Sequence, residues 1–363
     1  MVPIPRPGPG PGKPPPQPED QQAEAQARVR RSDVAHQAFE EDLVGPTLHP
    51  TLAVQVAMVA GAGSRNATDY RWNVYGTDLG HLFEHQGDLY MVFGDTFGEA
   101  GSTWRSNTMA RIANPDPASG LVFAEMMTDE SGQARELLGS RKVNGSEITV
   151  IPTCGTSAGG RMVLHYMSVR SWGAPGRWEV NHSGLAYSDD QGRSWHSNAD
   201  ARWPGTSNFA QVAITEHGGQ HYLFGLAAGR FGGVHLARVS LTAILDIGAY
   251  RYWDGVGWSR NPSRATTLVP APVGELSVQW SPFARRWLML YLDESLRAIV
   301  LRGSPQLTGP WSAPEVVATA EVYPTLYAPY IVPGTLDGPD LYFTMSRYDP
   351  YAVFLMRTTL TPA

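Results

Sequence analysis

Acidic residues recur beside apolar segments at four places in the sequence. Asp78 lies in GTDLGHLF, Asp95 in VFGDTFG, Glu147 in GSEITVIP and Glu275 in GELSVQW. When carboxyl groups are crowded into one site, the pKa of some rises while others stay ionised. A protonated carboxyl and an ionised one are the two groups that cleavage of a glycosidic bond requires. These residues are therefore candidates for a proton donor and for a base or nucleophile.

The same segments and their neighbours carry groups that suit sugar recognition, which needs flat apolar surfaces and hydrogen-bond donors. Gln211 in NFAQVAI and Tyr327 in LYAPYIV stand where the other segments have an acidic residue. Further candidates lie in or beside these segments and are Trp72, Trp104, Arg105, Asn107, Trp280 and Arg347. Structural explanations stay open as well, because aspartate beside glycine is typical of turns and tryptophan is typical of packing between sheets.

Short strand-like segments repeat through the chain. Five of them begin at Asp88, Arg161, Gln220, Arg285 and Asp340, and they recur roughly every 55 to 75 residues. Each follows a polar or glycine-rich turn, mixes apolar with aromatic residues, and is followed by a second strand of similar type. Five copies of one β-meander predict an all-β fold, a five-bladed β-propeller, because a sandwich would show frequent turns without this long period.

The segments with the acidic residues lie just upstream of these repeats. We expect each to be the innermost strand of its blade, which lines the central channel. The strand near residues 52–59 precedes the first blade and is expected to complete the last one, a closure that removes an exposed sheet edge. The turn SDDQGRSW, residues 188–195, has the spacing of an Asp-box, which is found between blade strands of sialidase-like propellers.

The sequence divides into three parts. Residues 1–20 are rich in proline and glycine and predict a disordered tether, residues 21–50 predict a short helix and a linker, and residues 51–363 predict the propeller as the catalytic domain. The first part lacks the basic and then apolar pattern of a secretory signal. We expect an extracellular or virion-associated protein, whose N-terminal segment also fits attachment to a larger assembly.

Composition argues against several kinds of partner. The formal net charge is -6 and there is no basic run beyond residues 28–31, so that nucleic acid is not an expected partner. The most apolar stretch, residues 52–62, is far too short to span a membrane. The histidines show no metal-ligand spacing, and we predict neither a metal site nor a cofactor.

Longer motifs give the sequence a specific resemblance. The run YGTDLGHLFEHQGDLYMVFGDTFG is followed by WRSN, EITVIPT, GELSVQW, TGPWS and YAPY. Together they resemble the family called domain of unknown function 4185, over about residues 52–361. That family includes endo-D-arabinanases of glycoside hydrolase family 183 from actinobacteria and their relatives. These enzymes cut the α-D-arabinofuranan of mycobacterial arabinogalactan and lipoarabinomannan.

The resemblance implies cleavage of internal arabinofuranosyl linkages, with arabinan as the polysaccharide partner. It implies that Asp78 and Asp95, from the GTDLG and GDTFG motifs, are the catalytic pair. Which of the two is the acid stays open at this point. We assign Glu147, Gln211 and Glu275 to sugar contact or to the setting of pKa values.

Two other functions fit parts of the sequence. A non-catalytic glycan-binding propeller, such as an adhesin on a phage tail, would use the same tryptophans and the same pocket. A sialidase-like hydrolase is suggested by the Asp-box. The sialidase is disfavoured, because only one such box is clear and no set of three arginines with a tyrosine and a glutamate emerges.

Overall fold

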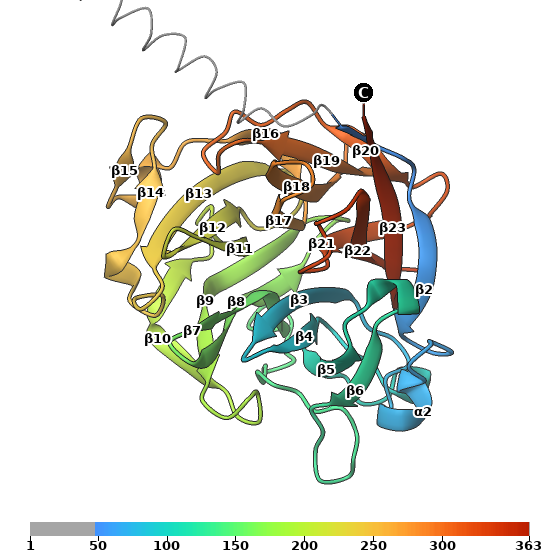
Figure 1. Cartoon of the computed structure of the whole chain (residues 1–363). Helices are drawn as coiled ribbons and strands as arrows, with labels where there is room; N and C mark the ends of the chain where they lie inside the picture. Colours follow the sequence, from blue (N-terminus) through green and yellow to red (C-terminus); the bar gives the residue numbers. More distant parts are fainter. Residues whose placement is uncertain (1–47, 363) are drawn as a thin grey trace, which may run out of the picture. The chain divides into compact units, whose positions relative to one another are not determined.

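The computed structural model describes residues 48–362, which form five antiparallel β-sheets arranged around a central axis (Figure 1). The predicted five-bladed β-propeller is therefore confirmed. The predicted tether, residues 1–20, and almost all of the predicted helix and linker, residues 21–50, lie outside the described residues. Residues 48–50 are described, and they form a strand.

The blades follow one another along the chain. The first contains β3 Leu79–His85, β4 Asp88–Phe93, β5 Thr108–Asn114 and β6 Val122–Met126. The second contains β7 Thr149–Ala158, β8 Arg161–Trp172, β9 Trp178–Ser188 and β10 His196–Pro204. The third contains β11 Gln211–His217, β12 Gln220–Leu226, β13 Gly232–Ser240, β14 Arg251–Trp253, β15 Trp258–Ser259 and β16 Val269–Val273.

The last two blades and the connections complete the ring. The fourth blade contains β17 Leu276–Ser281, β18 Arg286–Asp293, β19 Ala298–Ser304 and β20 Glu315–Thr319. The fifth contains β21 Leu326–Ile331, β22 Asp340–Arg347 and β23 Ala352–Pro362, with β1 Leu48–Pro50 and β2 Val54–Ala60. Short helical turns lie in the connections and are α2 Thr68–Trp72, η1 Glu99–Gly101, η2 Pro117–Ser119, η3 Ile247–Ala249 and η4 Pro262–Arg264.

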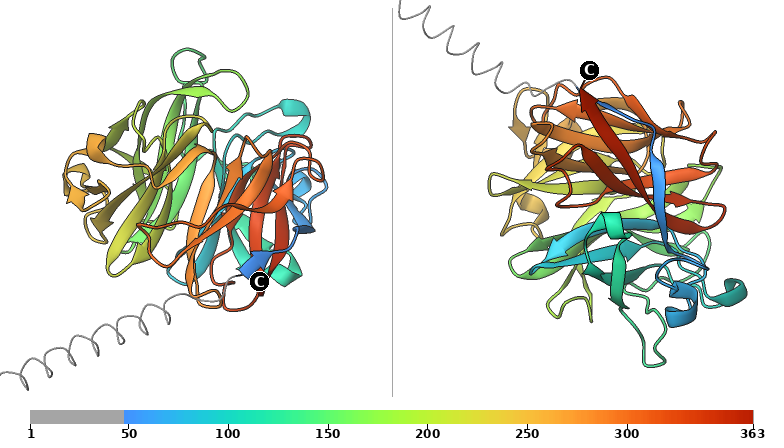
Figure 2. Two further views of the ribbon diagram at one scale, coloured as in Figure 1. Left: turned by 90° about the horizontal axis from the view of Figure 1, so that it is seen from above. Right: turned by 45° about the vertical axis from the view of Figure 1, so that its right-hand side comes forward.

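The fifth blade joins the two ends of the propeller. Strand β23 pairs with β22 on one edge and with β2 and β1 on the other, and the views of Figures 1 and 2 agree on this arrangement. The predicted closure of the last blade by an early strand is thus confirmed. Because β2 covers the edge of β23, the backbone groups on that edge are paired within the molecule.

Apolar side chains fill the spaces between neighbouring blades. The second strand of a blade is buried on both faces, as in RWLMLYLD of β18, which explains its nearly continuous apolar sequence. Between the first and second blades, Phe83 and Tyr90 pack with Met162 and Leu164. Phe83 lies so close to Gly155 that a Cβ atom there would be 2.4 Å from the phenyl ring. Each fully buried side chain of this size contributes about 1.5–3 kcal/mol to stability.

The Asp-box forms the expected turn between two strands of the second blade. Ser188 ends β9, and its hydroxyl donates to Asp190 and accepts from the backbone N–H of Gly192. Asp190 also accepts from the backbone N–H of Ser194 at 2.8 Å. Desolvation raises the pKa of Asp190. The hydrogen bonds from the hydroxyl and backbone N–H of Ser194 and from the hydroxyl of Ser188 together outweigh this effect and lower the pKa to about 2. The turn is structural and lies away from the residues that line the central cavity.

Two kinds of strand end meet at one face of the ring. The innermost strand of each blade begins there, and the second strand, which is antiparallel to it, ends there. In the first blade, Asp78 precedes β3 directly and Asp95 follows β4 by two residues. The backbone N–H of Gly94 donates to the Asp78 carbonyl at 3.2 Å, which extends the ladder and holds both aspartates beside the channel.

Candidate active site

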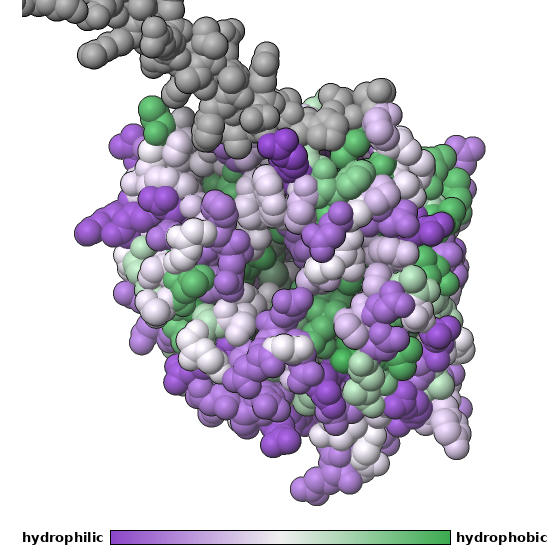
Figure 3. Space-filling model, viewed as in Figure 1, coloured by the Kyte–Doolittle hydropathy of each residue, from purple (hydrophilic) through white to green (hydrophobic). Residues whose placement is uncertain are grey.

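A cavity of about 1400 Å³ opens at the centre of the ring, and residues from all five blades line it. The space-filling view in Figure 3 shows the face hollowed near its centre. Five of the residues selected from the sequence contribute to the lining, namely Asp78, Asp95, Gln211, Glu275 and Tyr327. Four of these lie at the start of the innermost strand of their blade, as expected, and Asp95 follows the second strand of the first blade.

Asp78 is half-buried in this cavity, and its two carboxyl oxygens have different surroundings. The hydroxyl of Tyr327 donates to Oδ2 at 2.8 Å. Oδ1 is buried and has no hydrogen-bond partner among residues 48–362. Burial and the nearby charge of Asp95 raise the pKa of Asp78 to about 7, while the hydroxyls of Tyr327 and Tyr351 act in the opposite direction. Near neutral pH, Asp78 can therefore hold a proton.

A close approach explains the glycine in the GDTFG motif. Gly94 lies opposite Asp78 across the β3–β4 ladder. A Cβ atom on residue 94 would be 2.4 Å from Asp78 Oδ1, far below a contact distance. Only glycine leaves room for this carboxyl group. The glycine of the GDTFG motif therefore allows Asp78 to lie beside the segment that carries Asp95.

Asp95 is buried more deeply and accepts two hydrogen bonds at one oxygen. Trp104 Nε1 donates to Oδ1 at 2.8 Å, and Thr149 Oγ1 donates to the same atom at 2.6 Å. Burial raises the pKa of Asp95 to about 6, and the hydrogen bonds from Thr149 and Trp104 and the charge of Lys142 limit the rise. Its anion is thus better supported than that of Asp78. The charge of Asp95 raises the pKa of Asp78, so the protonation of Asp78 depends on that of Asp95.

Glu275 lies in the cavity lining but is held by a neighbouring cation. The Nε and Nη2 atoms of Arg230 donate to its carboxylate at 2.9–3.1 Å in a bidentate pair. Burial alone would lower the pKa of Arg230, but Glu275 raises it overall, so the guanidinium stays charged. The Arg230 guanidinium also lies 4.8 Å from the ring centroid of Tyr327. Glu275 is therefore linked to Asp78 by contacts through Arg230 and Tyr327, and its charge also raises the pKa of Asp78.

Several residues selected for sugar contact are not part of the cavity lining. Trp72, Arg105 and Asn107 are buried. Arg105 donates to the carbonyls of Ala134 and Asn73. The side-chain amide of Asn107 forms hydrogen bonds with the backbone of residues 137, 138 and 150. These three side chains are buried outside the cavity lining, and these hydrogen bonds of Arg105 and Asn107 go to the protein's own backbone, so that direct sugar contact by them stays a prediction.

Glu147, Arg347, Trp104 and Trp280 also lie outside the lining. Glu147 accepts from Ser168 at 2.6 Å, and Arg347 donates to the backbone carbonyl of residue 324 at 3.2 Å. Trp104 reaches the site through its hydrogen bond to Asp95, which sequence reasoning did not foresee. Trp280 stacks edge-on against Trp287 in the fourth blade.

Sequence reasoning missed a second set of lining residues. They follow or end the second strands of the other four blades and are Trp172, Arg230, Glu294 and Tyr348. Asp95 occupies the corresponding place in the first blade. These positions can be predicted from the sequence, because every strand that follows an innermost strand must end at the same face. Only the position in the first blade, that of Asp95, was predicted.

The donor set does not resemble a metal centre. Within residues 48–362, no group of three or more histidine, cysteine, aspartate or glutamate side chains is arranged to hold a metal ion. The cavity carboxylates are instead engaged by hydroxyl, indole and guanidinium donors. In the same part of the chain, no helix has the length and apolar character that crossing a membrane requires.

Known structures share this architecture. A protein from Bacteroides ovatus ATCC 8483, proposed to be a hydrolase, aligns with a TM-score of 0.57 and 14% identity over 81% of this chain and 88% of its own. An exo-beta-1,3-galactanase from Phanerochaete chrysosporium, solved with galactose, aligns with a TM-score of 0.51 and 10% identity over 85% of this chain and 64% of its own. At these identities the likeness shows the fold.

Sequence comparison reaches further than fold. Notoamide biosynthesis cluster protein J from Aspergillus sp. (strain MF297-2) is 30% identical over 315 residues, which span 79% of this chain and 83% of that protein. The pattern of the family described as Domain of unknown function (DUF4185) matches residues 63–357, a range that includes four whole blades, most of the fifth and both cavity aspartates. The chain therefore belongs to the DUF4185 family.

Proposed function

We propose that the chain is a glycoside hydrolase, an endo-D-arabinanase that cleaves internal α-D-arabinofuranosyl linkages of the mycobacterial-type arabinan in arabinogalactan and lipoarabinomannan. The observation that carries this proposal is the pair of aspartates in one cavity, with pKa values of about 7 and about 6. Two carboxyl groups whose pKa values are separated by their surroundings are what acid and base catalysis of glycoside cleavage requires.

The surroundings of the two aspartates suggest their roles. Asp78, with the higher pKa, donates its proton to the glycosidic oxygen of the leaving sugar as the bond to the anomeric carbon breaks. Asp95, whose anion accepts two hydrogen bonds, either deprotonates an attacking water or attacks the anomeric carbon itself. The positive charge that develops on the sugar in the transition state is stabilised by the ionised carboxylate.

Cavity charge supports a neutral glycan. Five carboxyl groups and three guanidinium groups line the cavity. Arg230, the most enclosed of these cations, is already paired with Glu275 and lies 3.5 Å from Glu294. An anionic substrate such as a sialoside would meet more acidic than basic groups in this lining, and its most enclosed arginine is already paired. Neutral arabinofuranosyl units avoid this repulsion.

Exposed aromatic side chains support a polymeric substrate. Trp172, at the end of β8, is 45% exposed, and Tyr348, after β22, is 72% exposed. Both contribute to the cavity lining and come from blades that are not adjacent in the ring. Flat aromatic faces on two sides of a cavity suit successive sugar units of one chain that crosses it. The choice of arabinan rests on the motif resemblance, and it implies action outside the cell or as part of a virion.

A non-catalytic glycan-binding propeller is the second candidate. The same exposed aromatic residues favour it, because stacking on Trp172 and Tyr348 needs no chemistry at the aspartates. An adhesin of this kind, for example on a phage tail, would bind the polymer and leave it intact. Binding and fragment release therefore have to be measured together.

The test uses purified mycobacterial arabinogalactan at about pH 6.5, between the two pKa values. The parent chain, Asp95→Asn and the matched control Asp200→Asn, which changes an exposed carboxyl on β10, are compared for binding and for soluble oligosaccharides detected by mass spectrometry. We expect fragments from the parent and from Asp200→Asn, and almost none from Asp95→Asn. Binding by all three without fragments from any would support the adhesin and overturn the hydrolase.

A further inference from the structure

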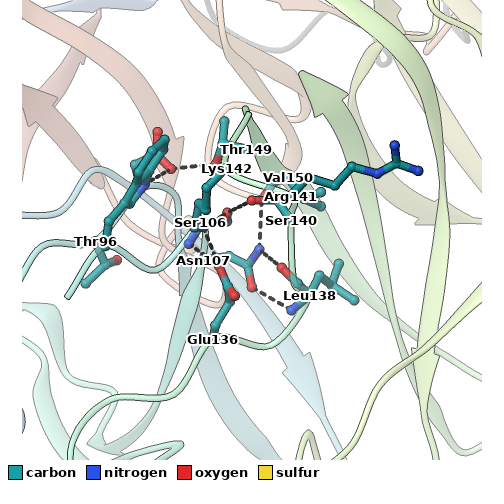
Figure 4. Close-up of polar contacts among 12 residues, drawn as sticks. Thr96, Ser106, Asn107, Glu136, Leu138, Ser140, Arg141, Lys142, Thr149 and Val150 are labelled. Atoms are coloured by element: carbon teal, nitrogen blue, oxygen red, sulfur yellow. Dashed lines mark hydrogen bonds and ion pairs between the residues drawn. The ribbon is translucent and has the colours of Figure 1, made fainter. Parts of the chain in front are cut away.

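A lysine covers the indole ring that holds Asp95. Lys142 Nζ lies 4.7 Å from the ring centroid of Trp104, whose Nε1 donates to Asp95. The ammonium is fixed by Glu136 Oε1 at 2.5 Å and by the hydroxyl of Ser106 (Figure 4). Lys142 does not contribute to the cavity lining. Its contacts therefore point to a role that acts through Trp104 and not through the substrate.

The WRSN motif builds the support for this lysine. Ser106 donates its backbone N–H to Glu136 at 2.6 Å, and its hydroxyl contacts Ser140 at 2.8 Å. The fully buried Asn107 donates to the carbonyls of residues 138 and 150 and accepts from the backbone N–H of residue 138 (Figure 4). It also accepts from the backbone N–H of residue 137. The motif thus connects residues 136–142 by hydrogen bonds to the start of the strand that follows Trp104. We infer that these hydrogen bonds fix the distance between the Lys142 ammonium and the indole ring.

Asp78, which lies in the same blade as Asp95, has a parallel arrangement. The hydroxyl of Tyr327 donates to Asp78, and the guanidinium of Arg230 lies 4.8 Å from the centroid of the same tyrosine ring. Glu275 fixes that guanidinium with a bidentate pair, as Glu136 fixes Lys142. In both arrangements, the aspartate accepts a hydrogen bond from an aromatic side chain. A cation lies over that aromatic ring, and a glutamate forms an ion pair with the cation.

We propose that Lys142 and Arg230 are positioning residues for the reaction, each acting on one cavity aspartate through the aromatic ring that it covers. A cation over an aromatic ring fixes the ring and withdraws electron density from it, which strengthens the ring's N–H or O–H as a hydrogen-bond donor. A stronger donor stabilises the carboxylate that accepts from it. The proposal rests on the proposed function for its catalytic meaning, but the arrangement itself is measurable without turnover.

The two arrangements differ in the charges that face each aspartate. Asp95 faces Lys142, whose charge lowers its pKa, and Glu136, whose charge raises it, with Asp78 in the same blade. Asp78 faces the charges of Asp95 and Glu275, which raise its pKa, and the hydroxyls of Tyr327 and Tyr351, which lower it. The same design therefore favours the anion at Asp95 more than at Asp78, which separates a base from an acid.

The experiment measures the pKa of each carboxyl directly, by carbon-13 NMR titration of protein labelled at the aspartate carboxyl carbon. Asp78→Asn and Asp95→Asn assign the two resonances. Lys142→Met and Trp104→Phe test the Asp95 arrangement, while Arg230→Met and Tyr327→Phe test the Asp78 arrangement. Lys142→Arg keeps a cation over the indole ring. Arg238→Met is the matched control, because Arg238 lies 4.1 Å from the Trp258 ring with no cavity carboxyl attached.

We expect the titration midpoint of Asp95 to move to higher pH in Lys142→Met and Trp104→Phe, and to stay near its original value in Lys142→Arg and Arg238→Met. The midpoint of Asp78 should rise in Arg230→Met and Tyr327→Phe. Circular dichroism verifies folding, and the tyrosine and tryptophan variants keep the test valid if a cation variant fails to fold. Midpoints of Asp95 that are unchanged in folded Lys142→Met, or shifted equally in Lys142→Arg, would overturn the proposal.

Turnover separates this proposal from the proposed function. If the parent chain releases arabinan fragments, Lys142→Met should lower kcat about 10-fold or more with little change in KM, because a small misplacement of a catalytic group is costly while substrate contacts stay intact. If the parent releases no fragments, the hydrolase assignment fails, and the NMR shifts still decide whether the two cations act on the aspartates. A rise in KM alone would argue for substrate contact and against positioning.

Discussion

At the scale of single residues, the cavity holds two aspartates that are alike in type and unlike in surroundings. Asp78 accepts a hydrogen bond from the hydroxyl of Tyr327, and the hydroxyl of Tyr351 also lowers its pKa. Asp95 has an indole donor and a threonine donor on the same oxygen. The difference follows from which blade supplies each donor, because Tyr327 comes from the fifth blade and Thr149 from the second.

These surroundings predict a bell-shaped pH dependence. The proposed roles need Asp95 ionised and Asp78 protonated, so kcat/KM falls below about pH 6, where Asp95 gains a proton, and above about pH 7, where Asp78 loses one. Initial rates on arabinogalactan, measured from about pH 4 to about pH 9, check this. A rate that rises steadily towards alkaline pH would contradict the assignment of Asp78 as the acid.

The raised pKa of Asp78 also predicts a cost in stability. Its ordinary pKa is 3.8 and its pKa in the fold is about 7, so between these values the folded state binds a proton that the unfolded state releases. The stabilising contribution is present below about pH 4 and is lost as the pH rises through 7. Asp78→Asn, which cannot ionise, should raise Tm at about pH 8 by roughly 2–5 °C and change it little at about pH 4.

Differential scanning calorimetry at both pH values measures this effect. Asp200→Asn, an exposed carboxyl, serves as the control and should show no such dependence on pH. An equal change in Tm for Asp78→Asn at the two pH values would mean that burial of the charge is not its cause.

Residue type alone did not distinguish residues that line the cavity from residues that support those lining residues. Asp78, Asp95, Gln211, Glu275 and Tyr327 were predicted at the channel from their place before or after a strand, and all five line the cavity. Tryptophan and arginine near those strands were read as sugar-binding, yet the same side chains suit support equally well. Which of these uses applies depends on contacts between distant segments, such as those of Asn107 with residues 138 and 150, and local sequence does not encode them.

At the scale of elements, the useful rule concerns strand ends. First strands begin and second strands end at one face, so each blade offers two positions to the cavity. Both positions can be located from the sequence in all five blades, because the repeated strands are easily recognised. The loops beyond those ends are harder to predict, and the turn after β8 is an example, since Gly176 accepts from the backbone N–H of Arg230 in the next blade.

Trp172 at the end of β8 provides an element-scale prediction. If it stacks on a sugar unit away from the bond that is cleaved, Trp172→Ala should raise KM for arabinogalactan by about 2- to 10-fold with little change in kcat. Tyr70→Ala is the control, since Tyr70 is 92% exposed on α2 and does not line the cavity. Steady-state kinetics with the polymer would reject the stacking role if Trp172→Ala and Tyr70→Ala behave alike.

At the scale of the whole molecule, the number of blades and the closure of the ring were predicted from the long repeat and from one early strand. The extra hairpin β14–β15 in the third blade and the size of the cavity were not. Both depend on insertions between repeated strands, and insertions have no periodic signal. The repeat thus fixes the ring, and the irregular segments shape what the ring can bind.

Ring closure predicts a clear effect of a short truncation. Two variants are compared, one beginning at residue 48 and the other at residue 61, which differ only in the segment that contains β1 and β2. Loss of β2 exposes the edge of β23 and removes the buried side chains of Val59 and Ala60. We expect a Tm lower by at least about 5 °C and a greater tendency to aggregate in the shorter variant. Equal melting curves for the two would mean that this strand is not needed for closure.

The central claim is that two aspartates in the central cavity cleave a glycan together. The most direct measurement is the rate at which reducing ends appear from mycobacterial arabinogalactan with the parent chain, Asp78→Asn, Asp95→Asn and the double variant, at saturating substrate and about pH 6.5. The account predicts that each single variant loses about 10²- to 10⁴-fold in rate, and that the double variant loses little more than the worse single variant. A single variant that cleaves at the parental rate would contradict it.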